Sequence, residues 1–171
     1  MAQTVFDPHE LGAAGDGKHD DTRAIQRALD EAGETAGAVV LAPGTYLCSA
    51  LRVPPNVALT GTPAWDYRSP GGSVLQLADE GARCLIDITG AFGATIQGLS
   101  LEGGGLGENV VGILMDKDDY GDQEDAPRID CCRVSHFSGD GVYLGRAWCF
   151  SVRHCMLSHN GGCGLQLRGG G

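Results

Sequence analysis

The sequence predicts an all-β fold, a parallel β-helix preceded by one capping α-helix. Residues 129–144 and 152–167 carry the same pattern at an offset of 23 residues, and apolar side chains recur at every second position within each copy. A third copy at 96–114 matches when two insertions are allowed. A fixed period of this length, with two short alternating strands per repeat, is typical of a solenoid.

The strand pattern selects the kind of solenoid. A leucine-rich repeat requires a Leu-x-x-Leu-x-Leu frame, which is absent. In a parallel β-helix, like residues of successive coils stack inside one core. The alignment predicts three such columns: Ile96/Ile129/Val152, Leu99/Cys132/Cys155 and Leu101/Val134/Leu157.

The first element of the chain is a turn followed by an amphipathic helix. Gly15-Asp16-Gly17 predicts a turn with positive φ values at its glycines. Asp20 or Asp21 then caps a helix that stops near Gly33. Four apolar residues share one face of this helix: Ile25, Ala28, Leu29 and Ala32. Such a helix would cover core that otherwise meets water at the open end of the solenoid.

Short strands follow the helix. Residues 38–41 and 45–47 predict two strands joined by a tight turn at 42–44. Two further strands are expected at 51–53 and 57–61. By length the 171 residues form one domain, with the turn and capping helix at 1–36 and the coils at 37–171.

Composition excludes several classes of partner. The net charge of −10 argues against nucleic acid and against an anionic membrane surface. No stretch approaches a membrane span, and the start of the chain shows no signal peptide. The localisation is therefore unknown: cytoplasmic as the sequence stands, secreted or on a virion if a signal or fusion partner is missing.

No amphipathic segment follows the strand at 165–168, so the last coil is expected to be open. Truncation of the chain is the preferred explanation. The alternatives are a homo-oligomer, such as a trimer, that covers the coil, or a short natural variant.

Seven cysteines are present, and no C-x-x-C spacing occurs among them. Their neighbours are apolar strand residues. We therefore expect buried thiols that behave as small hydrophobic residues, with no disulfide or metal role.

Residues 5–61 carry a family resemblance. The segments 15–30 (GDGKHDDTRAIQRALD), 39–46 (VVLAPGTY) and 57–61 (VALTG) closely resemble the N-terminal module of the pectate-lyase superfamily. The branch concerned holds rhamnogalacturonase-like and epimerase-like proteins and related phage tailspikes. The resemblance implies a right-handed parallel β-helix, a pectin-lyase-like solenoid.

The same resemblance implies a polysaccharide substrate, with β-elimination, hydrolysis or C5 epimerisation as the reaction. Uronate-containing or related glycans are the expected substrates. The alternative is a non-catalytic glycan-binding module, such as a tailspike or adhesin, or an inactive truncated fragment. Fold is implied more firmly than reaction, because the matching residues are architectural.

Two motif comparisons are negative. Residues 7–10 (DPHE) spell the catalytic tetrapeptide of the epimerase branch, but they precede the capping helix, whereas the family's site lies on later coils. We interpret this match as coincidence. The polygalacturonase pattern is also missing, since no Gly-His-Gly occurs.

An acidic loop is the candidate metal site. Residues 116–125 contain six carboxylates, and lyases of the superfamily often use Ca²⁺ to hold a uronate. The candidate Ca²⁺ ligands are Asp116, Asp118, Asp119 and Asp122. The alternative is a solvated acidic loop without a metal.

Candidate catalytic and substrate-binding residues come from stacked corners and outward strand positions. His136 is expected above His159 with Asp140 nearby, a pattern that suits general acid or base chemistry or a structural ladder. An outward arginine could serve as the base of β-elimination. The candidate catalytic residues are His136, Asp140, Arg146, Arg153 and His159. The candidate substrate-binding residues are Trp65, Tyr67, Arg68, Arg133 and Tyr143.

Overall fold

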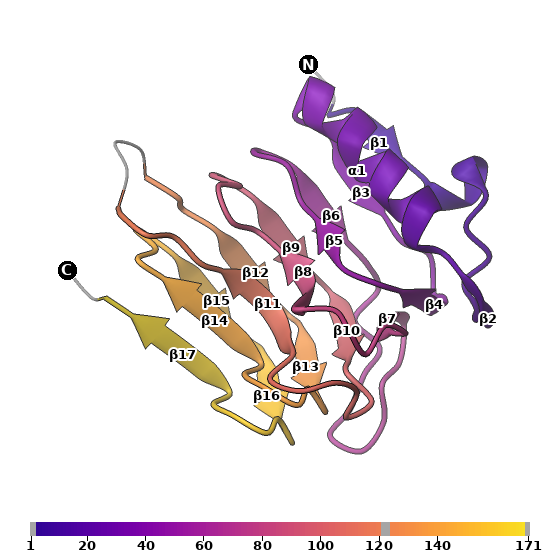
Figure 1. Ribbon diagram of the computed structural model, residues 1–171. Helices are drawn as coiled ribbons and strands as arrows, with labels where there is room; N and C mark the ends of the chain where they lie inside the picture. The colour runs from indigo at the N-terminus through magenta and orange to yellow at the C-terminus, as the bar shows by residue number, and fades with distance from the viewer. Residues whose placement is uncertain (1–2, 121–123, 170–171) are drawn as a thin grey trace.

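The computed structural model describes residues 3–120 and 124–169, which wind into a stack of three parallel sheets with one α-helix at its N-terminal end (Figure 1). Sheet A contains β1 (Val5–Phe6), β3 (Ala38–Val40), β6 (Ala58–Thr60), β9 (Thr95–Gln97), β12 (Arg128–Asp130) and β15 (Ser151–Arg153). Sheet B contains β2 (Asp16–Asp20), β4 (Gly44–Cys48), β7 (Ser73–Leu77), β10 (Leu99–Glu102), β13 (Arg133–Ser135) and β16 (Met156–Ser158). Sheet C contains β5 (Leu51–Arg52), β8 (Cys84–Asp87), β11 (Val111–Met115), β14 (Val142–Gly145) and β17 (Leu165–Arg168).

The strand register confirms the predicted columns. Ile129 pairs with Ile96 on one side and Val152 on the other, and Val134 pairs likewise with Leu101 and Leu157. The cysteine column follows from the same register, one residue before β13. Each coil has three strands and not the expected two, because a left-handed residue at Cys131 (φ 53°) splits the stretch 129–135 into β12 and β13.

The predicted helix is present as α1 (Thr22–Thr35), and all four apolar residues of its predicted face are fully buried. Asp20 accepts hydrogen bonds from the backbone N–H of Thr22 and from its hydroxyl, whereas the Asp21 carboxylate accepts from Ala14 N and Gly15 N. The expected stop near Gly33 is wrong, since the helix continues to Thr35. A Cβ at Gly33 would lie 2.9 Å from Pro54 Cβ, so this glycine serves close packing and does not end the helix.

The segment 7–10 forms a structural turn, η1 (Pro8–Leu11). Asp7 accepts a hydrogen bond from His9 N, and Pro8 is buried. Both ring nitrogens of His9 have partners, Ala13 O at 2.8 Å and Tyr46 Oη at 2.9 Å. The imidazole therefore ties η1 to β4, which explains this His without any catalytic role.

The short connections form corners between sheets. β3 and β4 lie in different sheets, so the turn at 42–44 is a corner and not a hairpin. The longest early connection, loop 62–72, is closed by an antiparallel bridge between Pro63 and Gly72. A Cβ at Gly72 (φ 71°) would lie 1.8 Å from Thr62 O, so only glycine fits at this closure.

The cysteines are more varied than predicted. Cys48, Cys84 and Cys132 are buried, and burial raises the pKa of Cys84 to about 12. Cys155 is half-buried, and a hydrogen bond from Cys132 lowers the pKa of Cys155 to about 7. Cys131 is also half-buried, and two more cysteines are exposed, Cys149 and Cys163. No disulfide links any of them.

The last coil is less buried than the others. Val152, Cys155 and Leu157 are only partly buried, although their column neighbours Ile129, Cys132 and Val134 are at most 1% exposed. Leu165 and Leu167 of β17 are exposed. Among the described residues, no helix is long and apolar enough to cross a membrane.

Candidate functional site

The candidate site lies on the outer face of sheet B. Leu101, Val134 and Leu157 point into the core, so their strand neighbours point outward. Loop 62–72 is fixed against this face, because Trp65 Nε1 donates a hydrogen bond to Cys131 O at 3.1 Å. Under the loop, outward side chains are shielded from water: Ser100, Arg133 and Ser135 are each at most 1% exposed.

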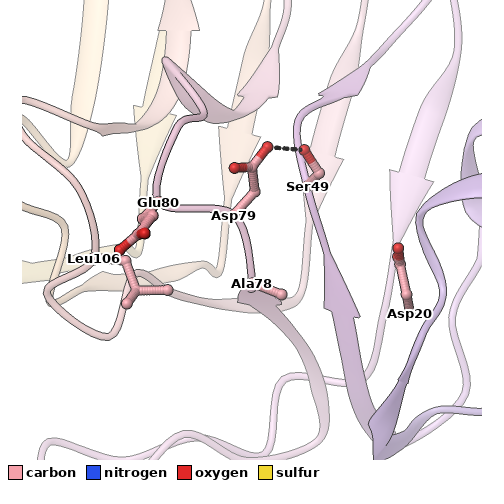
Figure 2. A pocket seen from close by; sticks show the side chains of 6 residues that line it. All are labelled: Asp20, Ser49, Ala78, Asp79, Glu80 and Leu106. Atoms are coloured by element: carbon pink, nitrogen blue, oxygen red, sulfur yellow. Dashed lines mark hydrogen bonds between the residues drawn. The ribbon is translucent and has the colours of Figure 1, made fainter.

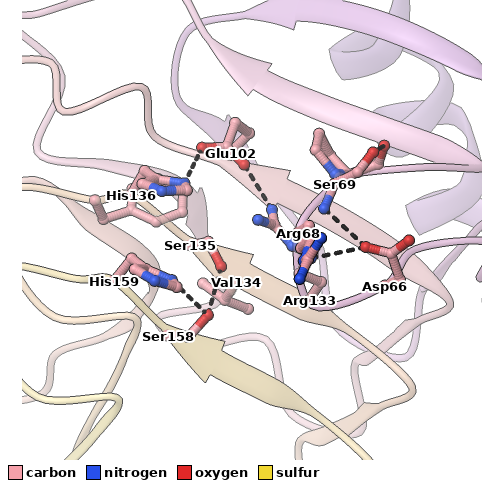
Figure 3. A network of polar contacts seen from close by, with 12 residues as sticks. Asp66, Arg68, Ser69, Glu102, Arg133, Val134, Ser135, His136, Ser158 and His159 are labelled. Atoms are coloured by element: carbon pink, nitrogen blue, oxygen red, sulfur yellow. Dashed lines mark hydrogen bonds and ion pairs between the residues drawn. The ribbon is translucent and has the colours of Figure 1, made fainter.

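A chain of three side chains crosses this face. Arg133 Nη1 donates to Glu102 Oε2 at 2.6 Å, and Glu102 Oε1 contacts His136 Nδ1 at 2.6 Å (Figure 3). When a neutral His136 donates from Nδ1, its Nε2 is left as a proton acceptor. The carboxylate thus orients the imidazole, and Arg133 orients the carboxylate.

Two imidazoles and a phenol form a row beside this chain. The rings of His136 and His159 stack with their centroids 5.2 Å apart. The centroid of the Tyr67 ring lies 5.6 Å from that of His159. His159 Nδ1 contacts Ser158 Oγ, which in turn contacts Ser135 Oγ at 3.1 Å. The predicted stacking of His136 and His159 is therefore present, and loop 62–72 extends the row.

An open groove of about 600 Å³ follows the two histidines. Its lining residues are Glu102, Gly104, Gly105, His136, Phe137, Ser138, His159 and Gly161. The Asp66 carboxylate fixes the tip of the adjoining loop by accepting from Arg68 N and Ser69 N. Arg68 itself is exposed and belongs to the same polar cluster (Figure 3). The groove therefore offers two imidazoles, and the adjoining loop carries a phenol and a cation, Tyr67 and Arg68.

Three predicted catalytic residues are engaged elsewhere. Asp140 Oδ1 accepts a hydrogen bond from Cys163 N at 2.6 Å. Arg146 Nη1 donates to Lys117 O, and Arg153 Nη2 donates to Asp130 Oδ2. The carboxylate that contacts His136 is thus that of Glu102 and not that of Asp140.

The predicted substrate-binding residues divide into two groups. Trp65, Tyr67 and Arg68 lie on loop 62–72, which the Trp65–Cys131 hydrogen bond and the Tyr67–His159 ring contact hold beside the stacked histidines. Arg133 points to the same face but is 1% exposed and paired with Glu102, so it orients other groups and does not meet solvent. Tyr143 packs on sheet C against Cys84, Val111 and Leu114, away from this site.

The acidic loop is internally paired where it is described. Lys117 Nζ contacts both oxygens of the buried Asp125 at 2.8 Å, and Asp116 forms an ion pair with Arg83. Asp118 is exposed and Asp119 is engaged in an interaction of its own. Asp122 lies outside the described residues. Among the described residues, Asp116, Asp118 and Asp119 do not form a converging three-donor group, and Ca²⁺ binding by the loop stays a prediction.

A second hollow, of about 420 Å³, is lined by carboxylates (Figure 2). Asp20, Asp79 and Glu80 contribute the charge, and Asp79 accepts a hydrogen bond from Ser49 Oγ at 2.9 Å. Of the described residues that line this hollow, none has a cationic side chain. Its charge would repel an acidic glycan, so it is a poor candidate for the substrate site.

Glu102 is the residue that sequence reasoning missed. It pairs with Ser135 in the register, which places it beside His136. The offset between these coils is 33 residues and not 23, because the connection after Glu102 is long. A search for carboxylates one coil before each stacked histidine, with that insertion allowed, would have found it.

The fold defines a class, a parallel β-helix built from three sheets. Residues 7–69 match the family model described as rhamnogalacturonase A/epimerase, pectate lyase-like. Over this segment the chain is similar to pectate-lyase-like proteins, and two mannuronan C-5 epimerase modules share its fold. No curated protein sequence matches the chain.

Solved structures share the fold. The A-module of the Azotobacter vinelandii mannuronan C-5 epimerase AlgE4 is 24% identical over 96% of this chain, with a TM-score of 0.76. ORF18 of Geobacillus virus E2 is 18% identical over 84% of the chain and 28% of its own length, with a TM-score of 0.65. PfbA, a surface adhesin of Streptococcus pneumoniae, is 15% identical over 89% of the chain and 37% of its own, with a TM-score of 0.59. The chain spans about half the length of the epimerase module, 48%.

Proposed function

We propose that this chain is part of a polysaccharide-active protein that binds a uronate-containing glycan in the groove on sheet B. The observation that carries the proposal is the Arg133–Glu102–His136 chain at the edge of an open groove. The family match and the epimerase neighbours support an acidic polysaccharide as ligand. Tyr67 and His159 offer ring faces to the sugars, and Arg68 offers a guanidinium to a carboxylate.

The proposed chemistry is removal of the proton at C5 of a uronate. His136 Nε2 accepts this proton, and Glu102 stabilises the imidazolium that forms. In β-elimination the C5 electron pair forms a C4–C5 double bond as the C4–O bond breaks, and the leaving oxygen takes a proton. In epimerisation C5 instead receives a proton on the opposite face. Both reactions share the first step, so the same residues serve either.

The test is an assay of polygalacturonate and alginate for three products. Ultraviolet absorbance of 4,5-unsaturated ends reports elimination, NMR of the polymer reports epimerisation, and new reducing ends without absorbance report hydrolysis. We expect elimination or epimerisation, with a 10²–10⁴-fold loss of rate in His136→Gln. Cys163→Ser, on the exposed surface, is the matched control. Full activity of His136→Gln would overturn the proposed base.

A second candidate is glycan binding without turnover. It is favoured by the engagement of Asp140, Arg146 and Arg153 in internal contacts. This leaves His136 and Glu102 as the acid–base pair that lines the groove. The virus protein and the adhesin among the structural neighbours are consistent with it. Saturable binding of oligouronates with none of the three products would select this candidate.

We also propose that the two ends of the stack are both covered in the functional protein. The buried face of α1 joins the core at the N-terminal end, so the helix serves as its cap. The exposed Leu165 and Leu167 would be covered by further coils or by a second copy of the chain. Size-exclusion chromatography with light scattering distinguishes the two alternatives, because only coverage by a second copy predicts an oligomer of the 17.7 kDa chain.

A further inference from the structure

The corner between sheets A and B holds three donors of different chemistry. Asp130 ends β12, Cys131 follows it, and His154 occupies the same corner one coil later. One donor atom from each residue lies within 4.8 Å of the other two. The cluster is separate from the groove and from the acidic loop, and the proposed glycan chemistry does not use it.

The backbone repeats itself at this corner and so places the side chains together. Cys131 and His154 both have left-handed conformations, with φ of 53° and 52°. Asp130 and Arg153 are register partners, so the residues that follow them are stacked. The hydrogen bond from Trp65 Nε1 fixes the carbonyl of Cys131. Donors from adjacent coils therefore project from the same corner.

The distances are close to those of a tetrahedral metal site. Bond lengths of about 2.0–2.3 Å place the ligands of tetrahedral Zn²⁺ about 3.3–3.8 Å apart. Cys131 Sγ lies 3.6 Å from Asp130 Oδ1, and His154 Nδ1 lies 2.8 Å from the same oxygen. His154 must withdraw slightly, and its side chain is 70% exposed, so it has room. Arg153 occupies the other oxygen, Oδ2, and leaves Oδ1 for a metal.

We propose that Asp130, Cys131 and His154 form a binding site for one divalent transition metal ion of the Zn²⁺ class. Thiolate, imidazole and carboxylate together select such an ion over Ca²⁺ or Mg²⁺, which prefer oxygen ligands. Three protein ligands leave a fourth position for water. Binding releases the thiol proton of Cys131 and replaces the hydrogen bond between His154 and Asp130.

The test is titration of the full chain with Co²⁺, after removal of metals and under a phosphine reductant. We expect one equivalent of Co²⁺ to produce thiolate-to-metal charge-transfer absorption, which Zn²⁺ then abolishes. Cys131→Ser should remove the absorption, and His154→Ala should weaken binding at least tenfold. Cys149→Ser and Cys163→Ser, which remove exposed thiols elsewhere, should change neither.

Circular dichroism and the thermal midpoint verify that each variant folds. Cys131 and His154 face outward, so both substitutions should preserve the fold. The proposal would be overturned by absence of the charge-transfer band at millimolar Co²⁺. Persistence of the band in Cys131→Ser, or its loss in Cys149→Ser or Cys163→Ser, would overturn it equally.

Discussion

The loop 116–125 and the outer face of sheet B are both rich in charge, but their charges face different groups. In the loop, Lys117 forms an ion pair with Asp125, and Asp116 forms an ion pair with Arg83. On sheet B, the buried pair Arg133–Glu102 supports His136, which faces an open groove. The number of charges in a region therefore does not define a site. What matters is which groups remain available once the internal pairs are made.

The largest expected effect tests the structural role of the loop. Asp125 is 4% exposed, contacts Lys117 Nζ with both oxygens and accepts a hydrogen bond from Trp148 N. Asp125→Ala leaves a partly buried ammonium unpaired, so we expect a loss of about 3–5 kcal/mol of unfolding free energy. Urea denaturation measures it. A loss below about 1 kcal/mol would show that the loop is a solvated surface.

The next effect tests the support on sheet B. Glu102→Gln keeps the shape but weakens the interaction with buried Arg133, and we expect a loss of about 1–3 kcal/mol of unfolding free energy. Activity or glycan affinity should fall as well, because His136 loses its orienting carboxylate. Glu108→Gln, an exposed carboxylate on the neighbouring connection, is the control. Unchanged function with lowered stability would reduce Glu102 to a structural residue.

A smaller effect on stability is expected for the residues that face the groove. His159→Ala removes a ring that stacks on His136 and contacts Tyr67. Because this ring is exposed, the unfolding free energy of the protein should change by no more than about 0.5 kcal/mol. Oligouronate affinity should nevertheless fall several-fold, measured by calorimetry. Equal affinity of the variant and the parent protein would remove the groove from the binding site.

The smallest effect is expected from Ca²⁺. The described carboxylates of the loop are paired or do not converge, so millimolar CaCl₂ should leave the thermal midpoint unchanged to within about 1 °C. Binding to the folded state alone would raise the midpoint. A clear rise that is lost in Asp118→Asn would identify the acidic loop as a Ca²⁺ site.

Much of the fold could be predicted from sequence, because inward positions repeat. Val134 and Leu157 had to be apolar and 23 residues apart for the core to be continuous, and this leaves a periodic trace. The stacked His136 and His159 follow from the same register. The predicted end of the helix is two residues short, because Gly33 packs closely against Pro54 and does not terminate the helix. The position of Pro54 beside the helix leaves no local signal in the sequence.

The side-chain contacts within the candidate site could not be predicted in the same way. Asp140 was expected beside His136 because it is near in sequence, but its carboxylate turns to the backbone of Cys163 on the next coil. Arg133 was expected to be available because it points outward, but loop 62–72 lies over it. Both outcomes depend on contacts between coils and loops, and these leave no period in the sequence.

The most direct test uses the two tryptophans, one in each region. Trp65 lies on the loop over sheet B, and Trp148 donates its backbone N–H to Asp125 beside the acidic loop. The measurement is the shift of the two indole N–H signals in ¹⁵N NMR spectra during titration with an oligouronate. We expect saturable movement of the Trp65 signal and none of the Trp148 signal. Movement of Trp148 alone, or of neither, would contradict a glycan site on sheet B.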